Sequence, residues 1–341
     1  MTNLATLPPQ TQTSFESLAA LFKASGDPLR LEILRVLRRN TFGVMELSQL
    51  FDMRQSGMSH HLKVLAKAGL VVSQREGNAI FYRRPLDAGA HSADAWAARQ
   101  VFAAVDRLPL SEERRAKVDA IRSQRSAQSR AFFARYAEHF REQQELIAEY
   151  DLYAEPVTNL IDSRRDDLNH TAALEIGPGE GDFLATLARR FNRVVAVDNS
   201  AEMLSQCEQT VSEAALGNVE LVCGEAGDLA NRAERFDLIV ANMVLHHVPN
   251  PADVFADVAE LLAPSGRLIV SELSRHDQNW VRENCGDIWL GFDPEELTVW
   301  AEEVGLAAEE PLFIGLRNGF QVQVREFIKP SDVRHQTSDA K

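Results

Sequence analysis

Apolar positions in the first 86 residues recur at the spacing of short amphipathic helices and then give way to two β-type runs. Asp27 and Pro28 are typical of a helix N-cap and first turn. The apolar residues that follow share one helical face, formed by Leu29, Ile33, Val36 and Leu37. A second short helix has its own apolar face, formed by Val44, Leu47, Leu50 and Phe51. With a turn at 52–56, this order predicts a helix-turn-helix.

A third helix, predicted at about 55–68, has an apolar side and a polar side. Met58, Leu62 and Leu65 form the apolar side, which we expect in the core. The polar side is short and rich in hydrogen-bond donors, namely Gln55, Ser56, Ser59, His60 and Lys63. Such a side fits the major groove of DNA, because Gln, Ser and His can reach base edges and Lys can reach phosphate oxygens. Taken singly, each of these residues fits a solvated helix face equally well.

The runs at 70–75 and 79–84 predict two strands around a Gly-containing turn. Arg75, Arg83 and Arg84 lie on this hairpin. A basic hairpin that directly follows a recognition helix is typical of a wing, so the whole order of elements predicts a winged helix that binds DNA.

The stretch 87–150 is rich in strong helix formers, with Pro109 as the one breaker. Phe132, Tyr136 and Phe140 recur at four-residue spacing, which predicts long helices with one half-buried stripe. These helices are either a spacer or a connector that forms a dimer contact and relays a ligand signal.

From residue 171 the chain alternates short apolar runs with helical stretches. Five runs are strand candidates, at 172–176, 193–198, 219–223, 236–242 and 266–273. Continuous apolar strands separated by helices predict a parallel sheet covered on both faces, with a ligand crevice at the C-terminal strand ends. The stretch 312–328 predicts a closing antiparallel hairpin, and Asp293, Pro294 and Glu296 predict the start of a helix that carries Trp300.

Unusual residues stand at these predicted strand ends. Glu175 closes the first strand, and Gly177, Gly179 and Gly181 form a tight turn into a helix expected near Asp182. Glycines let backbone approach a ligand, and a helix start offers free N–H groups. The spacing differs from the dinucleotide fingerprint and favours a ligand with an amino group. Asp198 closes the second strand, where a carboxylate can accept both hydroxyls of a ribose.

Net charge divides the chain into two parts of opposite sign. Residues 14–86 hold eleven Lys or Arg and six Asp or Glu, a net +5, so the other residues of the chain carry −14 − 5 = −19. A basic domain on an acidic body is typical of a DNA binder with a second, non-DNA ligand, although a solvated imbalance would look the same. No apolar segment reaches membrane-spanning length, and the three cysteines have no paired spacing, so we expect a cytoplasmic protein with no membrane partner and no disulfide framework.

Residues 15–84 resemble the ArsR/SmtB family of winged-helix repressors. The resemblance lies in "LFKASGDPLRLEILRVL", "SHHLKVLAKAGLV" and "REGNAIFYRR". It implies a homodimer that reads two half-sites of double-stranded operator DNA and is released by an effector. Many members hold a metal through a Cys-x-Cys pair, but "VMELSQLF" at the matching place has no cysteine. Adjacent histidines such as His60 and His61 diverge by about 100° on a helix, so we expect no metal.

Residues 130–328 resemble class I S-adenosylmethionine-dependent methyltransferases. "LEIGPGEGDFL", "CGEAGDL" and "ANMVLHHVPNPADVFADVAELLAPSGRLIVSEL" carry this resemblance. It implies that S-adenosylmethionine, or S-adenosylhomocysteine as an effector, is bound. Glu175 and the glycine loop would serve its methionine end, Asp198 its ribose, Glu225 and Ala226 its adenine, and Asn242 the pocket floor. His246, His247 and His276 are weak candidates for chemistry, with packing as the alternative.

The predicted fold class is therefore α/β plus α+β: a winged helix-turn-helix, a helical connector and a Rossmann-like seven-stranded methyltransferase fold. The predicted organisation is a tail at 1–13, a DNA-binding domain at 14–86, a connector at 87–129, a methyltransferase domain at 130–329 and a second tail at 330–341. Two functions stay open. One is an ArsR-type regulator that senses S-adenosylmethionine or S-adenosylhomocysteine and controls methionine-cycle genes. The other is an active small-molecule methyltransferase with an autoregulatory DNA-binding domain.

Overall fold

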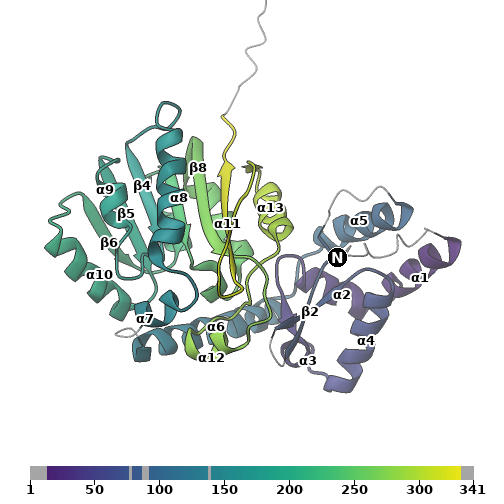
Figure 1. The fold of residues 1–341 in the computed structure, drawn as a ribbon. Coiled ribbons are helices and arrows are strands. Elements are labelled where there is room, and N and C mark those ends of the chain that lie inside the picture. Colours follow the sequence, from purple (N-terminus) through teal and green to yellow (C-terminus); the bar gives the residue numbers. More distant parts are fainter. Residues whose placement is uncertain (1–13, 77–78, 87–91, 137–139, 332–341) are drawn as a thin grey trace, which may run out of the picture. The chain divides into compact units, whose positions relative to one another are not determined.

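The computed structural model describes residues 14–76, 79–86, 92–136 and 140–331. The chain divides into two compact units, residues 1–119 and 120–341 (Figure 1). Of the two predicted tails, only residues 330 and 331 belong to the described part. No helix of the described residues is both long enough and apolar enough to cross a membrane.

The first unit is a helical domain with a small antiparallel sheet. Its helices are α1 (Phe15–Ser25), α2 (Pro28–Val36), α3 (Val44–Leu50), α4 (Gln55–Lys67) and α5 (Ala93–Asp106). Its strands are β1 (Phe42–Gly43), β2 (Val72–Glu76) and β3 (Ala79–Arg83), in the order β1-β3-β2. Helix α5 packs against α1 and α2.

Helix caps and hydrophobic periodicity in the sequence explain most of the helices and strands of this unit. The Asp27 carboxylate accepts a hydrogen bond from the Arg30 backbone N–H (2.9 Å), and Pro28 occupies the first turn of α2, as predicted. The apolar side of α4, formed by Met58, Leu62 and Leu65, is fully buried. The hairpin of β2 and β3 is the predicted wing. Strand β1 pairs with β3 and was not predicted, because two residues are too few to show a periodicity.

The second unit is a three-layer α/β domain. Helix α6 (Glu112–Tyr136) begins in the first unit and continues into the second. The other helices are α7 (Phe140–Glu145), α8 (Tyr150–Ser163), α9 (Leu184–Ala188), α10 (Ala201–Glu213), α11 (Pro251–Leu261), α12 (Trp280–Asn284) and α13 (Pro294–Glu303). Two 3₁₀ turns are η2 (Ala226–Leu229) and η3 (Leu245–His247).

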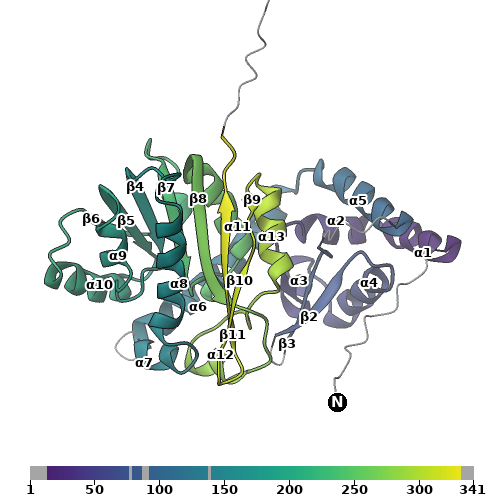
Figure 2. The ribbon, with the colours of Figure 1, turned by 45° about the horizontal axis from the view of Figure 1, so that its top comes forward.

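The sheet has the predicted parallel core and antiparallel edge. Its strands are β4 (Ala172–Ile176), β5 (Arg193–Asp198), β6 (Val219–Cys223), β7 (Phe236–Asn242), β8 (Leu262–Leu273), β9 (Ala307–Ala308), β10 (Leu312–Gly315) and β11 (Gln321–Ile328). Their order is β10-β11-β8-β7-β4-β5-β6, with the short β9 beside β11 (Figure 2). Strands β4 to β8 run parallel and β11 runs antiparallel to β8. The Rossmann-like fold class is thus confirmed.

Helices cover both faces of this sheet. Val157 of α8, Leu184 of α9 and Cys207 of α10 share one core cluster with inward side chains of the sheet, among them Val322. Phe327 lies at odd register from Val322 and so points to the other face. There its ring packs 5.5 Å from Phe255 of α11, which also contacts Trp300 of α13. Trp300 therefore belongs to a covering helix, as predicted from its capping box.

The structure corrects two predicted boundaries. The helix after the glycine turn begins at Leu184 rather than near Asp182 and has five residues, because positions 177, 179 and 181 all take positive φ and prolong the loop. Strand β8 begins at Leu262, before the predicted start at Gly266. Because α9 has only five residues, its helix dipole is small and its N-terminus would bind an anion weakly.

Candidate ligand pocket and DNA-facing surface

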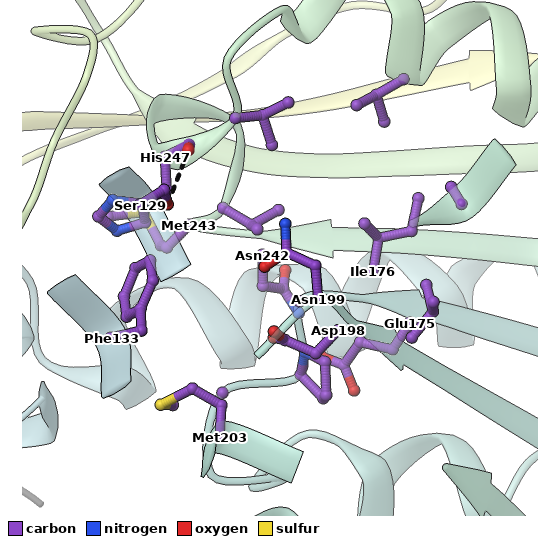
Figure 3. Close-up of a pocket in the computed structure, with 18 of the residues that line it drawn as sticks. Ser129, Phe133, Glu175, Ile176, Asp198, Asn199, Met203, Asn242, Met243 and His247 are labelled. Carbon is purple, nitrogen blue, oxygen red and sulfur yellow. Dashed lines mark hydrogen bonds between the residues drawn. The ribbon is translucent and has the colours of Figure 1, made fainter. Parts of the chain in front are cut away.

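A cavity of about 270 Å³ lies at the C-terminal ends of the parallel strands, within the second unit (Figure 3). The ends of β4, β5 and β7 supply Glu175, Asp198 and Asn242 to its wall. Parallel strands bring their carboxyl ends to one edge of the sheet, so residues far apart in sequence meet there. All predicted cofactor-binding residues except Gly181 line this cavity.

Glu175 is buried at the cavity with part of its carboxylate unsatisfied. Its residue is 2% exposed, and Oε2 has no hydrogen-bond partner among the described residues. Burial raises the pKa of Glu175 to about 8, although the neighbouring Asn242 amide acts to lower it. The Asn242 Nδ2 is likewise buried without a partner in the described part of the chain, while Asn242 Oδ1 accepts a hydrogen bond from Ser271 Oγ (2.9 Å). A ligand that brings both a donor and an acceptor would satisfy these atoms.

The three glycines of the turn do different things. Gly177 has φ +65°, and a Cβ there would lie 2.3 Å from Val244 Cγ2. Gly179 has φ +57° and open space around it, so its backbone is accessible from the cavity. Gly181 has φ +89°, and a Cβ there would lie 2.9 Å from Cys207 Sγ. Gly181 therefore serves the packing of α10 against the turn, outside the cavity wall.

Asp198 ends β5 and faces the cavity. Its Oδ1 accepts a hydrogen bond from the Ser200 backbone N–H (2.8 Å), and burial raises the pKa of Asp198 to about 6. Glu225 and Ala226 begin the turn η2, whose geometry is held by a hydrogen bond from the Glu225 N–H to Asp228 Oδ2 (2.9 Å). Ala226 is buried and Glu225 is exposed, and both line the cavity.

One face of α6 forms a wall that the sequence did not predict. The residues on it are Arg122, Ser126, Ser129 and Phe133. Arg122 pairs with Asp253 (2.8 Å), and the Ser129 hydroxyl lies 3.4 Å from the His247 carbonyl (Figure 3). The spacing of four, three and four residues is the signal for one helical face, but the polar character of three of the four concealed it.

Arg141 of α7 is a second residue that the sequence did not predict. It lines the cavity beside the glycine turn and forms ion pairs with Asp182 and with Glu180 (3.4 Å). These carboxylates raise the pKa of Arg141, which stays charged.

The three candidate histidines are in different environments. His247 lines the cavity, and its ring packs edge-on against Phe133 with centroids 5.0 Å apart. His246 is buried outside the cavity wall, where Nδ1 lies 2.5 Å from Glu272 Oε1. His276 also lies outside the wall, against Phe320, and burial lowers its pKa to about 4. Only His247 is thus placed to contact a ligand.

The predicted DNA-contacting residues of α4 lie on its solvent side. Gln55, Ser56, His60 and Lys63 are exposed, and Ser59 is half-buried. On the wing, Arg75 is exposed, whereas Arg83 is half-buried with Nε 3.4 Å from Gln74 Oε1. Arg84, expected on the hairpin, lies one residue after β3 and points inward. Its guanidinium pairs with Asp106 (2.7 Å) and also donates to the Leu34 carbonyl (2.6 Å).

Two family models match separate parts of the chain. Residues 27–73 match the bacterial regulatory proteins of the arsR family, and residues 174–270 match the methyltransferase domain. The ubiquinone biosynthesis O-methyltransferase of Coxiella burnetii is 29% identical over 146 residues, which cover 39% of this chain and 62% of that protein. The chain therefore spans less than two thirds of this relative's length.

Solved methyltransferase structures are also similar to part of this chain. The N-methyltransferase NodS from Bradyrhizobium japonicum, in complex with S-adenosyl-l-homocysteine, is 19% identical with a TM-score of 0.43, covering 56% of this chain and 98% of that one. The magnesium protoporphyrin IX methyltransferase from Synechocystis, with bound SAM, is 18% identical with a TM-score of 0.42, covering 52% and 78%.

The second unit has a Rossmann-like fold, and residues 174–270 within it match the methyltransferase-domain model. The chain thus joins a region that matches the arsR family model to a region that matches the methyltransferase-domain model.

Proposed function

We propose that the chain is a DNA-binding transcriptional regulator whose operator affinity depends on S-adenosylmethionine or S-adenosylhomocysteine held in the second unit. The observation that carries the proposal is the buried carboxylate of Glu175, unsatisfied at the wall of a pocket, in a chain that also has an arsR-family helix-turn-helix. By resemblance to such fusions, the regulated genes would be those of the methionine cycle.

The pocket residues fit this ligand group by group. The ammonium of the methionyl end would donate to Glu175 Oε2, which compensates the cost of burying that carboxylate. The ribose hydroxyls would donate to Asp198, and the adenine would lie against Ala226 and Glu225. Arg141 stands near the glycine turn as a cation for the ligand carboxylate. S-adenosylmethionine, when bound, supplies a methyl group activated by its sulfonium.

On the DNA side, Lys63 and Arg75 would contact phosphates, and Gln55, Ser56, Ser59 and His60 would face the major groove, with Arg83 supporting the wing. A homodimer would place two such helices on two half-sites. In support of a dimer, α1 and α5 pack together and expose large apolar side chains: Phe15 (94%), Phe22 (53%) and Trp96 (58%).

Helix α6 is the element through which ligand and DNA states would be coupled. In the first unit its Lys117 pairs with Asp52 in the turn before α4, and its Arg114 stacks on Phe51 (4.1 Å). In the second unit its Ser129 and Phe133 line the pocket. A coupling of about 1–3 kcal/mol would change DNA affinity roughly 5- to 150-fold, which is sufficient for a regulatory switch.

The decisive experiment is a DNA-binding titration of the full chain on an operator selected from a random duplex library. Affinity is measured alone, with S-adenosylmethionine and with S-adenosylhomocysteine. We expect at least one nucleoside to change the dissociation constant five-fold or more. Equal affinities in the three conditions would refute sensing, and the absence of any selected sequence would refute specific DNA binding.

A second candidate function is methyl transfer, favoured by His247 at the pocket wall. Burial and the neighbouring His246 lower the pKa of His247, so its imidazole is neutral and could accept a proton from an acceptor hydroxyl. Because the Coxiella relative is named as an O-methyltransferase, phenols are the first acceptors to test. Formation of S-adenosylhomocysteine that depends on a phenol would support catalysis. Equal rates with and without every phenol in the panel would argue for the sensor alone.

A further inference from the structure

Behind the pocket wall, four ionisable side chains lie together with almost no access to solvent. They are His246 and His247 of η3, Glu272 of β8 and Asp287 of the loop after α12. His246, His247 and Asp287 each offer a ligand atom, and these three atoms lie within 4.8 Å of one another. Buried charges normally need a partner, so this arrangement requires an explanation.

Asp287 is the least satisfied member of this buried cluster. Its side chain is fully buried, and neither carboxylate oxygen has a hydrogen-bond partner among the described residues. His247 Nδ1 lies 4.0 Å from Asp287 Oδ1, and the charges of His246 and Arg282 also act on this carboxylate. Glu272 already pairs with His246, whereas both oxygens of Asp287 are buried without a hydrogen bond among the described residues, so a small cation would occupy these unsatisfied oxygens.

Glu272 orients His246 in the way that carboxylates orient metal-bound histidines. Its Oε1 lies 2.5 Å from His246 Nδ1, and its Oε2 accepts from the His246 backbone N–H (3.2 Å). The Leu273 N–H donates to the same carboxylate (2.6 Å). A hydrogen bond at Nδ1 leaves Nε2 as the nitrogen of His246 that can bind a metal.

Adjacent histidines on an α-helix point in different directions and rarely bind the same metal ion, but the 3₁₀ turn η3 brings the rings of His246 and His247 closer together. The rings of His60 and His61 on α4 have centroids 6.1 Å apart, whereas those of His246 and His247 are 4.1 Å apart. The tight turn and the backbone bonds from Ile288 and Trp289 to the His246 carbonyl hold the second pair together beside Asp287. The sequence argument against paired histidines therefore does not apply here.

We propose that His246, His247 and Asp287 form a binding site for a divalent transition-metal ion, with Glu272 positioning His246. Two imidazoles and one carboxylate suit Zn²⁺ or a similar first-row ion, and they leave a coordination position open. In a tetrahedral site with bonds of about 2.0–2.1 Å, ligand atoms are roughly 3.4 Å apart, so small side-chain rotations would close the cluster. His247 lines the pocket (Figure 3). We therefore expect an oxygen donor on a molecule bound there to take the open position.

The test uses metal-free full-length protein titrated with Co²⁺, whose visible absorption reports coordination geometry, followed by displacement with Zn²⁺. We expect one ion per chain and absorption bands of a four- or five-coordinate site. Asp287→Asn keeps the shape of the side chain but removes its charge and one oxygen ligand, and should weaken binding at least ten-fold. Glu272→Gln should weaken it about 10- to 100-fold by disturbing His246.

Two matched controls keep the result specific. His170→Gln removes a histidine outside the cluster, and Cys223→Ser removes the exposed cysteine, and both should bind Co²⁺ as the parent does. Circular dichroism checks folding, and His247→Gln serves if Asp287→Asn does not fold. Equal affinity in parent and cluster variants, or no Co²⁺ bands at all, would overturn the proposal. The titration needs neither nucleoside nor DNA, so its failure leaves the regulatory function untouched.

Discussion

The polar side of α4 and the wall of the pocket both collect hydrogen-bonding side chains, but they differ in their access to water. Lys63 and His60 are exposed, so their charges and donors cost little to maintain in the free protein. Glu175 is almost fully buried, with an oxygen left unsatisfied. A phosphate needs a cation at the surface, whereas a small polar ligand is recognised by groups already removed from water.

The pocket, unlike the polar side of α4, contains buried polar groups that lower the stability of the protein without ligand. An unsatisfied buried polar group lowers the stability of the free protein by about 1–3 kcal/mol. Proteins tolerate such groups at binding sites, where a bound ligand satisfies them. Substitutions in the pocket should therefore change ligand affinity and stability in opposite directions. Substitutions on the polar side of α4 should change DNA affinity while stability stays nearly constant.

The largest effect is expected from Asp198→Ala. It removes the carboxylate that would accept the ribose hydroxyls, so calorimetric binding of S-adenosylhomocysteine should fall at least 100-fold, beyond detection at ordinary protein concentrations. DNA binding without nucleoside should persist, because the first unit is unchanged. Glu208→Ala, on the exposed side of α10, is the matched control and should bind as the parent does. Full affinity in Asp198→Ala would show that the ribose assignment is wrong.

Glu175→Gln should separate stability from binding. Burial raises the pKa of Glu175 to about 8, above the ~4.3 of an unfolded chain, so the folded protein loses stability as pH rises from about 4.3 to about 8. A neutral Gln avoids this loss. We expect little difference in the free energy of unfolding at pH 5 and a gain of about 1–3 kcal/mol for Glu175→Gln at pH 9.

The same variant should bind S-adenosylhomocysteine at least ten-fold more weakly at pH 8, because its amide cannot pair with the ligand ammonium as a carboxylate does. Denaturant titrations at several pH values and calorimetry provide the two measurements. A stability difference that does not grow with pH would mean that the Glu175 carboxylate is solvated in the free protein.

The smallest effect is expected from Lys63→Ala, an exposed position. If Lys63 contacts a phosphate, the variant should bind all duplexes a few-fold more weakly and reduce the slope of log affinity against log salt by about 1. Thermal stability should not change. Arg165→Ala removes an exposed cation of the second unit and is the control. An unchanged salt slope would exclude the phosphate contact.

Much of the pocket was predictable from the sequence because parallel strands end at one edge of a sheet. Four of the five predicted parallel strands have the predicted bounds, since continuous apolar runs leave few alternatives. Glu175 and Asp198 follow from these ends. The part of the pocket wall formed by α6 could not be predicted in this way, because a polar helical face shows no hydrophobic periodicity. Gly181 was predicted to bind the ligand, but a side chain at this position would instead meet Cys207.

The sequence by itself determined the order of the elements, the recognition helix with its buried and exposed sides, and the residues at the strand ends. These features depend on local periodicity and on helix capping, and both involve residues that are close together in the sequence. Only the tertiary structure decided that Asp287 lies beside His246 and His247, that Arg84 turns inward, and that α6 borders the pocket. Such contacts form between residues that are far apart in the sequence, so no local sequence pattern predicts them.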